Sequence, residues 1–139
     1  FSSKLNKNSI VINGDLLTKV NYKSLLDFHE QNKSIFTLGV REYDYIVPYG
    51  VVEINNKKAK KLLEKFKIKH FINAGIYVLS PQVIKKIPKN KFFNMTDLMD
   101  PLLKKDLVYS YPIYEYWVDI GKMEDFNRAD SDYSEVFSK

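Results

Sequence analysis

The sequence predicts an α/β fold in which a mixed, mostly parallel sheet is flanked by helices. Short apolar runs alternate along the chain with stretches of helical spacing, and this alternation is typical of strands joined through helices. The first apolar run, Ile10-Val11-Ile12, holds no polar residue, as expected of an inner strand buried on both faces. A chain of 139 residues with 45% hydrophobic side chains is large enough for one domain with one core.

The first half of the chain alternates extended and helical patterns. The expected elements are, in order, a strand at 10–12, a helix at 22–32, a strand at 34–40, a loop at 47–50, a strand at 51–54 and a turn at 55–56. The helix is indicated by Leu25, Leu26 and Phe28, which fall near one another at helical spacing. The pattern at 59–65 fits an edge strand or a short helix.

The second half begins with a strongly apolar run. The expected elements are a strand at 71–79, a short helix opened by Ser80 and Pro81, a helix entered at 94–98, a strand at 108–113, a loop at 117–121 and a helix at 123–133. Pro81 suits the first position of a helix that Ser80 caps, and Thr96 is the expected cap of the next helix.

The composition restricts the metals and partners that the chain can use. Because cysteine is absent, thiolate metal sites and disulfides are excluded, and only oxygen and imidazole ligands remain. His29 and His70 lie far apart without a partner at metal spacing, so we expect each to be structural or on the surface. A hard ion, Mg²⁺, is the expected cofactor.

The net charge of +5 raises the question of nucleic-acid binding, because lysines crowd the segment 57–69. Aromatic residues are not interleaved with these lysines in an RNA-binding pattern, and a solvated basic face is the usual meaning of such a run. We therefore expect no nucleic-acid partner. No apolar stretch approaches the roughly 20 residues that span a bilayer, and residues 1–8 lack the apolar core of a signal peptide. We expect a soluble, cytoplasmic protein with no membrane partner.

One carboxylate, Asp15, stands three residues after the end of the first apolar run. Ligands of α/β folds bind in the crevice beyond the carboxyl ends of parallel strands, and Gly14 lets the backbone approach a ligand there. An acid in this position could hold a metal over a phosphate. The alternative is that Asn13-Gly14-Asp15 is ordinary turn chemistry.

Five short motifs occur in one order between Ser9 and Tyr133. They are Ile10–Leu17, Val47–Glu53, Glu64-Lys65-Phe66, Phe71–Leu79 and Tyr116–Gly121. With these motifs the chain resembles the sugar-phosphate nucleotidyltransferases, most closely the mannose-1-phosphate guanylyltransferase-like branch. The resemblance implies a Rossmann-like fold and transfer of a nucleoside monophosphate from an NTP to a sugar 1-phosphate, with release of pyrophosphate.

The resemblance also implies roles for particular residues. Asp15 and Asp119 match the family's paired metal aspartates, and Lys65 matches the catalytic lysine that contacts the sugar phosphate. Glu64 would contact the sugar. The amide of Asn73 and the backbone of Gly50 would face sugar hydroxyls.

Each of these roles has a plainer alternative. Lys65 could be a surface lysine, because Phe66 stands where the family motif has proline and the neighbours are lysines. Asp119 could cap the helix near Met123, and Asn73 could be structural. Tyr116 and Trp117 could form a wall of the sugar site, although a single tryptophan is more often part of a core.

The family's N-terminal glycine-rich nucleotide loop has no counterpart here, because the five glycines are scattered. We therefore expect residues 1–139 to be the C-terminal part of a catalytic domain, without the N-terminal nucleotide-binding part. The chain alone is expected to be inactive, and to self-associate or to pair with that part. The sequence identifies neither the base nor the sugar.

Two other functions stay open. The chain could be a non-catalytic sugar-phosphate-binding or regulatory module of the same fold. A metal-dependent glycosyltransferase would need an Asp-x-Asp pair, for which Asp130-Ser131-Asp132 is the main match. This pair falls in a predicted helix, which ranks the glycosyltransferase last.

Overall fold

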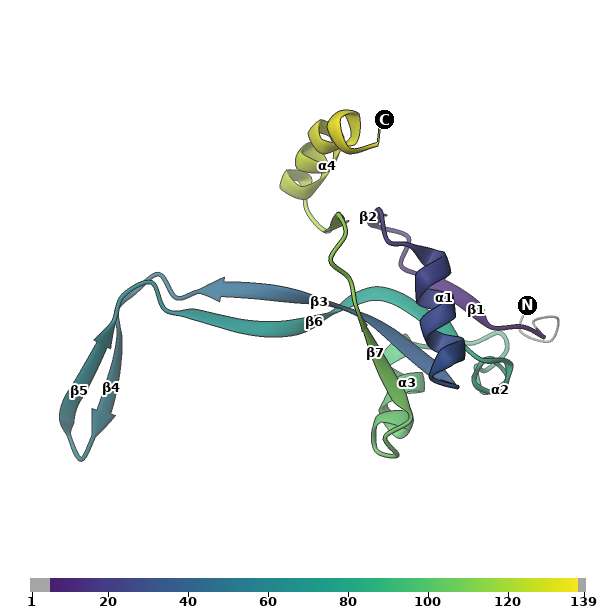
Figure 1. Cartoon of the computed structure of the whole chain (residues 1–139), viewed down its shortest axis with the longest axis horizontal. Helices are drawn as coiled ribbons and strands as arrows, with labels where there is room; N and C mark the ends of the chain where they lie inside the picture. The colour runs from purple at the N-terminus through teal and green to yellow at the C-terminus, as the bar shows by residue number, and fades with distance from the viewer. Residues whose placement is uncertain (1–5, 138–139) are drawn as a thin grey trace.

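A computed structural model describes residues 6–137, so the single domain expected over 1–139 can be followed except at residues 1–5 and 138–139. In chain order the elements are β1 (Ser9–Ile12), β2 (Leu16–Thr18), α1 (Tyr22–Gln31), β3 (Phe36–Ile46), β4 (Val51–Asn55), β5 (Lys58–Leu63), β6 (Lys67–Leu79), α2 (Pro81–Ile84), α3 (Met95–Leu103), β7 (Val108–Pro112), β8 (Trp117–Asp119) and α4 (Met123–Val136). The predicted α/β class, with a mixed sheet flanked by helices, is confirmed (Figure 1).

The main sheet has the strand order β1-β6-β3-β7. Strand β6 runs antiparallel to both β1 and β3, and β7 runs parallel to β3. Within this sheet the parallel pairs are therefore the minority, contrary to the expectation. The reason is that β3 and β6 are joined through the β4–β5 hairpin, so the chain reverses direction between them and the two strands must be antiparallel.

Strand β1 is an edge strand of the described sheet, which corrects the prediction of an inner strand buried on both faces. It pairs only with β6, its residues Ser9 to Val11 are half-buried, and Ile12 is 42% exposed. A groove runs beside this edge, lined by β1 together with Ile84, Ile87 and Pro88. An apolar run shows that a strand avoids water, but it does not show which neighbouring strand covers it.

The outer halves of β3 and β6 leave the sheet as a two-stranded ribbon that carries the β4–β5 hairpin at its end (Figure 1). The ribbon pairs residues 41–46 of β3 with residues 67–72 of β6. The undecided segment 59–65 is therefore mainly strand β5. The hairpin turns at Asn56 and Lys57, whose φ angles are +45° and +64°, one residue later than predicted.

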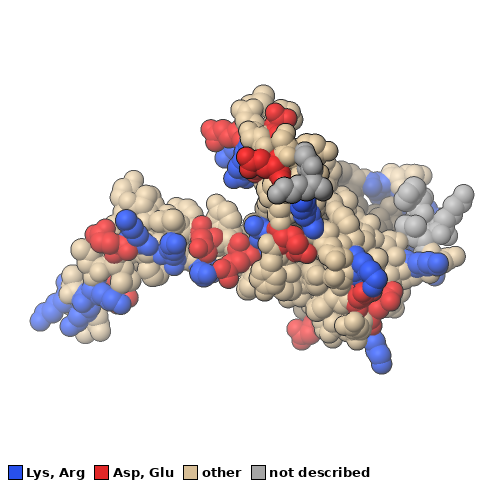
Figure 2. All heavy atoms as spheres, turned by 45° about the horizontal axis from the view of Figure 1, so that its top comes forward, with Lys and Arg blue, Asp and Glu red and all other residues tan. Residues whose placement is uncertain are grey.

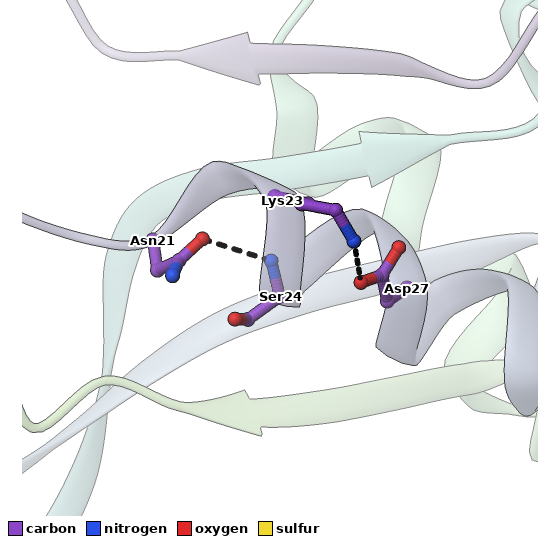
Figure 3. A network of polar contacts seen from close by, with 4 residues as sticks. All are labelled: Asn21, Lys23, Ser24 and Asp27. Carbon is purple, nitrogen blue, oxygen red and sulfur yellow. Dashed lines mark hydrogen bonds and ion pairs between the residues drawn. The ribbon is translucent and has the colours of Figure 1, made fainter.

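Asparagine is the N-cap residue of both α1 and α3, and the cap of α3 differs from the predicted one. Asn21 caps α1 by accepting a hydrogen bond from the Ser24 amide at 3.0 Å, and Lys23 pairs with Asp27 one turn later (Figure 3). Helix α3 is capped by Asn94 rather than by Thr96. The Asp97 carboxylate reaches back to the Asn94 amide, which places Thr96 inside the first turn.

Alternating side chains of β6 supply two apolar clusters. One packs Phe36, Tyr77 and Leu79 against α2 and α3, through Val83, Ile84, Leu98 and Leu102. The other packs Ile76 and Val78 around Leu25 of α1, with Val20, Ala74 and Ile113. The period of two along β6 is what places successive residues in different clusters.

The two histidines lie as expected. His29 is buried, and its Nδ1 lies 2.8 Å from the Thr37 hydroxyl. Thr37 in turn donates to the Ser34 hydroxyl, which donates to the Phe36 carbonyl. Burial lowers the pKa of His29, so the ring is kept neutral in this network. His70 is exposed.

Within residues 6–137, none of the helices combines the length and the apolar character needed to cross a bilayer.

Candidate functional site

Asp15 and Asp119 lie side by side, as the sequence predicted. Strands β2 and β8 form a separate antiparallel pair in which Leu16 is opposite Asp119. The amide of Ile120 donates to the Asp15 carbonyl at 2.8 Å. Two acids from opposite ends of the chain are thus held at one end of a short ladder. Residues 117–119 form a strand rather than the predicted loop, because β2 supplies a pairing partner.

The two carboxylates repel each other. Asp119 is exposed, but partial loss of solvent around its carboxylate and then the nearby charges of Asp15 and Asp125 raise its pKa. Bound cations relieve such repulsion. No group of three or more potential ligands lies together in the described part of the chain. A pair of carboxylates fits Mg²⁺, which often takes one or two protein carboxylates and fills its other positions with water and phosphate oxygens.

An irregular segment of β6, residues 73–75, holds both acid-bearing loops. The Asn13 amide donates to the Gly75 carbonyl at 2.9 Å. The indole Nε1–H of Trp117 donates to the neighbouring Ala74 carbonyl, also at 2.9 Å. Asn13 and Trp117 each stand two residues before an acid, so adjacent carbonyls fix the positions of Asp15 and Asp119.

Asn73 stabilises this segment through both polar atoms of its side chain. The amide oxygen accepts from the Gly75 N–H at 2.9 Å, and the amide nitrogen donates to the Tyr77 hydroxyl at 2.9 Å. The β3–β6 register shifts opposite this point, between Leu38 and Val40. In this conformation the Asn73 side chain therefore has a structural task, and its contact with sugar hydroxyls stays a prediction.

The other predicted substrate residues come together at the joint between the ribbon and the hairpin. The Val47 amide donates to the Phe66 carbonyl and closes the joint. A Cβ on Gly50 would stand 3.2 Å from the Glu64 Oε1 atom. Lys65 turns the chain with a φ of +52°. Gly50, Glu64 and Lys65 thus lie together at this joint, and their contact with a substrate stays a prediction.

This group lies far from the acid pair. The hairpin stands at the far end of the ribbon, whereas β2 lies beside the main sheet (Figure 1). The ladder from Val40–Asn73 to Ile46–Lys67 covers roughly 20 Å at about 3.4 Å per residue. We call the ribbon (residues 41–46 and 67–72) and the hairpin (residues 51–63) together the arm, and lysines gather at its end (Figure 2). The structure therefore places the predicted site residues in two separate groups.

The residue before Trp117 anchors α4. The Tyr116 hydroxyl donates to Asp132 at 2.7 Å, and its ring meets Phe137 edge to face. Burial, followed by the bond to Asp132, raises the pKa of Tyr116 to about 12. Asp132, one acid of the Asp-x-Asp pair considered for a glycosyltransferase, thus holds α4 in place through Tyr116.

Sequence reasoning did not single out Arg41. Its Nη1 donates to the Glu115 carbonyl at 2.8 Å, and its guanidinium lies 5.9 Å from the centre of the Trp117 ring. These contacts join β3 to the segment before β8, which no local pattern reveals. The available signal was that Arg41 is one of only two arginines in a chain rich in lysine.

Comparison with known proteins gives consistent matches. The model of a family described as nucleotidyl transferase matches residues 1–136. The chain is 32% identical to a mannose-1-phosphate guanylyltransferase of Mycobacterium tuberculosis over 133 residues, which are 91% of this chain and 37% of that protein. It is 30% identical to a mannose-1-phosphate guanyltransferase of Saccharomyces cerevisiae over 129 residues, which are 88% of this chain and 36% of that protein.

The chain thus spans little more than a third of these relatives. Among solved structures, it resembles a candidate glucose-1-phosphate thymidylyltransferase from Bacillus anthracis in complex with sucrose. The TM-score is 0.67 and the identity 21%, over 94% of this chain and 56% of that one. This likeness shows a shared fold.

Proposed function

Because the chain belongs to the nucleotidyl transferase family, we propose that it forms the metal-binding and sugar-phosphate-binding part of a sugar-1-phosphate nucleotidyltransferase. In this reaction a phosphate oxygen of the sugar 1-phosphate attacks the α-phosphorus of an NTP. The bond to pyrophosphate breaks, and a nucleotide sugar forms. The observation that carries the proposal is the convergence of Asp15 and Asp119.

In the proposed site, Asp15 and Asp119 would hold Mg²⁺, and the ion would offset the repulsion between the two phosphates. The contacts of Asn13 and Trp117 with residues 74 and 75 keep the two carboxylates in place. The names of the relatives make mannose 1-phosphate and GTP the first substrates to test.

Lys65, Glu64 and Gly50 supply the sugar-phosphate contacts in this proposal. A lysine suits the task because its ammonium is a compact charge on a flexible stem. A phosphate held by Lys65 reaches the acid pair only if the arm bends toward β2 and β8. The pairing is interrupted at two places where such a bend can occur, namely the register shift next to Asn73 and the joint at 47–50 and 64–66.

The free edge of β1 supports a strand-pairing partner. Unpaired strand edges beside apolar grooves tend to be covered in natural proteins. We propose that β1 pairs with a strand of a second copy, or with a strand from the part of the relatives that this chain does not cover. We place the reaction in the cytoplasm.

The experiment measures pyrophosphate release by the full-length protein from GTP and mannose 1-phosphate. Asp15→Asn and Asp119→Asn should each lower turnover by several orders of magnitude, because each removes one metal ligand with little change of shape. Asp27→Asn is the matched control, since Asp27 pairs with Lys23 on the surface of α1.

Turnover above a tenth of the wild-type rate at saturating Mg²⁺ would remove the substituted aspartate from the metal site. A wild-type protein that binds mannose 1-phosphate but forms no pyrophosphate would instead indicate the non-catalytic module.

A further inference from the structure

Arg41 stands at the base of the ribbon, on the side of the acid pair. It lies on β3 opposite Ile72, one pair after Val40 and Asn73, and its side chain is half-buried. One guanidinium nitrogen donates to the Glu115 carbonyl, and the guanidinium faces the Trp117 ring. These two contacts fix the side chain in one orientation.

The charge of Arg41 has no counterion among residues 6–137, where every carboxylate lies beyond ion-pairing distance from it. The Glu115 carboxylate accepts hydrogen bonds from the amides of Asn21 and Tyr114. The next residue along β3, Glu42, points to the other face and pairs with Lys69 at 2.6 Å. The neighbouring acids are thus all engaged elsewhere.

A half-buried cation without a counterion is costly, so this arrangement favours an anion that completes it. The guanidinium has five N–H donors in a planar fork, and the bond to Glu115 uses one of them. The fork matches two oxygens of a phosphate, and the Trp117 ring supports its plane.

Trp117 connects Arg41 with the acid pair. Trp117 and Asp119 are separated by one residue on β8, so their side chains leave the strand on the same side. The Trp117 indole also binds the Ala74 carbonyl in the segment that positions Asp15. Arg41 is therefore on the acid side of the ribbon, whereas Lys65 is at its far end.

We propose that Arg41 binds phosphoryl oxygens of the substrate, with Trp117 as the surface that orients its guanidinium. The inference rests on the proposed function and extends it, because it gives the acid pair a cation that does not depend on movement of the arm. The phosphoryl group belongs either to the sugar 1-phosphate or to the triphosphate, and separate titrations distinguish these sources.

The test uses the fluorescence of Trp117, the only tryptophan of residues 1–139, with any tryptophan outside these residues replaced by phenylalanine. The full-length protein is titrated with mannose 1-phosphate and, separately, with inorganic pyrophosphate, both with Mg²⁺ and at constant ionic strength. Calorimetry measures the same affinities. Arg41→Gln should weaken one or both ligands about ten- to a hundredfold, the range for a lost charged hydrogen bond. The affinity of Arg41→Lys should lie between those of the wild type and Arg41→Gln, since lysine keeps the charge but lacks the planar fork of N–H donors.

Arg128→Gln is the matched control, because Arg128 lies on α4 and faces Asp125. Its affinities should equal those of the wild type. If Arg41→Gln weakens the affinity for mannose 1-phosphate alone, Arg41 binds the phosphate of the sugar. If it weakens the affinity for pyrophosphate alone, Arg41 binds the triphosphate. Unchanged affinities in Arg41→Gln, with or without a loss of thermal stability, would make Arg41 purely structural. This result would overturn the inference about Arg41 and leave the proposed function intact. If the wild type bound neither ligand, the proposed function would fail as well.

Discussion

The side chain of Asn13 occupies the space beside Gly75 that a Cβ atom would need. Its Nδ2 would lie 2.7 Å from a Cβ at Gly75, whose φ is +68°, while its own amide donates to the Gly75 carbonyl. Glycine is thus required at position 75 by both backbone conformation and packing. This contact ties the loop of Asp15 to the central strand β6.

Gly75→Ala should lower the free energy of unfolding by about 2 kcal/mol or more, since strain at a positive φ adds to the clash with Asn13. Urea unfolding measures the change. Gly14→Ala is the control, because nothing lies within 4 Å of a Cβ there, and it should stay within about 0.5 kcal/mol of the wild type. Equal stability of the two variants would contradict the packing argument.

Asp119→Asn should stabilise the fold at neutral pH in the absence of Mg²⁺. The pKa of Asp119 is raised in the folded state by partial loss of solvent and by Asp15, so ionisation of Asp119 costs stability as the pH rises through that pKa. Thermal unfolding should show a higher midpoint for the variant at pH 7. The difference should vanish near pH 3, where the acid is protonated in both states. A lower midpoint at pH 7 would refute the repulsion between the two carboxylates.

His29 should make the protein less stable as the pH falls below 6.5. Because burial lowers its pKa in the folded state, the unfolded chain binds the proton first, and the stabilising contribution of His29 is lost between 6.5 and the lower folded value. Urea unfolding between pH 7.5 and 5 measures this slope, which should be smaller in His29→Gln. His70→Gln, at an exposed position, should keep the wild-type slope. Equal slopes in all three proteins would contradict the prediction.

Lys65→Ala should mainly raise the KM for the sugar 1-phosphate in the full-length protein. A phosphate contact made in the ground state is worth about 1.5–3 kcal/mol for a charged hydrogen bond, and it appears largely in KM. Steady-state kinetics with Lys57→Ala as the control separates this effect from a general loss of basic charge. An unchanged KM would place Lys65 on the surface.

The 139-residue chain alone should self-associate and should release no pyrophosphate. Its β1 edge and the groove beside it are open, and such edges favour association between chains. Sedimentation and a pyrophosphate assay check the two expectations. A monomer would argue against pairing at β1, and rapid pyrophosphate release would show that the chain needs no further nucleotide-binding part.

Local patterns were sufficient for most individual elements and insufficient for their pairing. The apolar run at 10–12 and the helical spacing after Asn21 specify β1 and α1, because residues close in sequence determine them. Whether β1 is an inner or an edge strand depends on distant strands. The short strand β8 exists only because β2 pairs with it.

In the candidate site too, some features could be predicted from local sequence, whereas others depend on distant strands. The meeting of Asp15 and Asp119 could be expected, because each acid follows an apolar run and lies within two residues of a glycine. The separation of Lys65 from them could not, since it follows from the pairing of residues 41–46 with 67–72 far from the core. The contacts of Arg41 with Glu115 and Trp117 likewise join residues far apart in the sequence.

The hairpin at the end of the ribbon gives the molecule two levels of local stability. A two-stranded hairpin is marginal in water by itself, and Ile54 and Leu62 are largely exposed here. Amide hydrogens of β4 and β5 should therefore exchange long before those of β6 near Ile76. Trypsin should cut first at Lys57 or Lys58, leaving two fragments that the β3–β6 ladder still holds together. Gly50, Glu64 and Lys65, which we propose bind the substrate, should therefore be able to lose their order while Asp15 and Asp119 keep theirs.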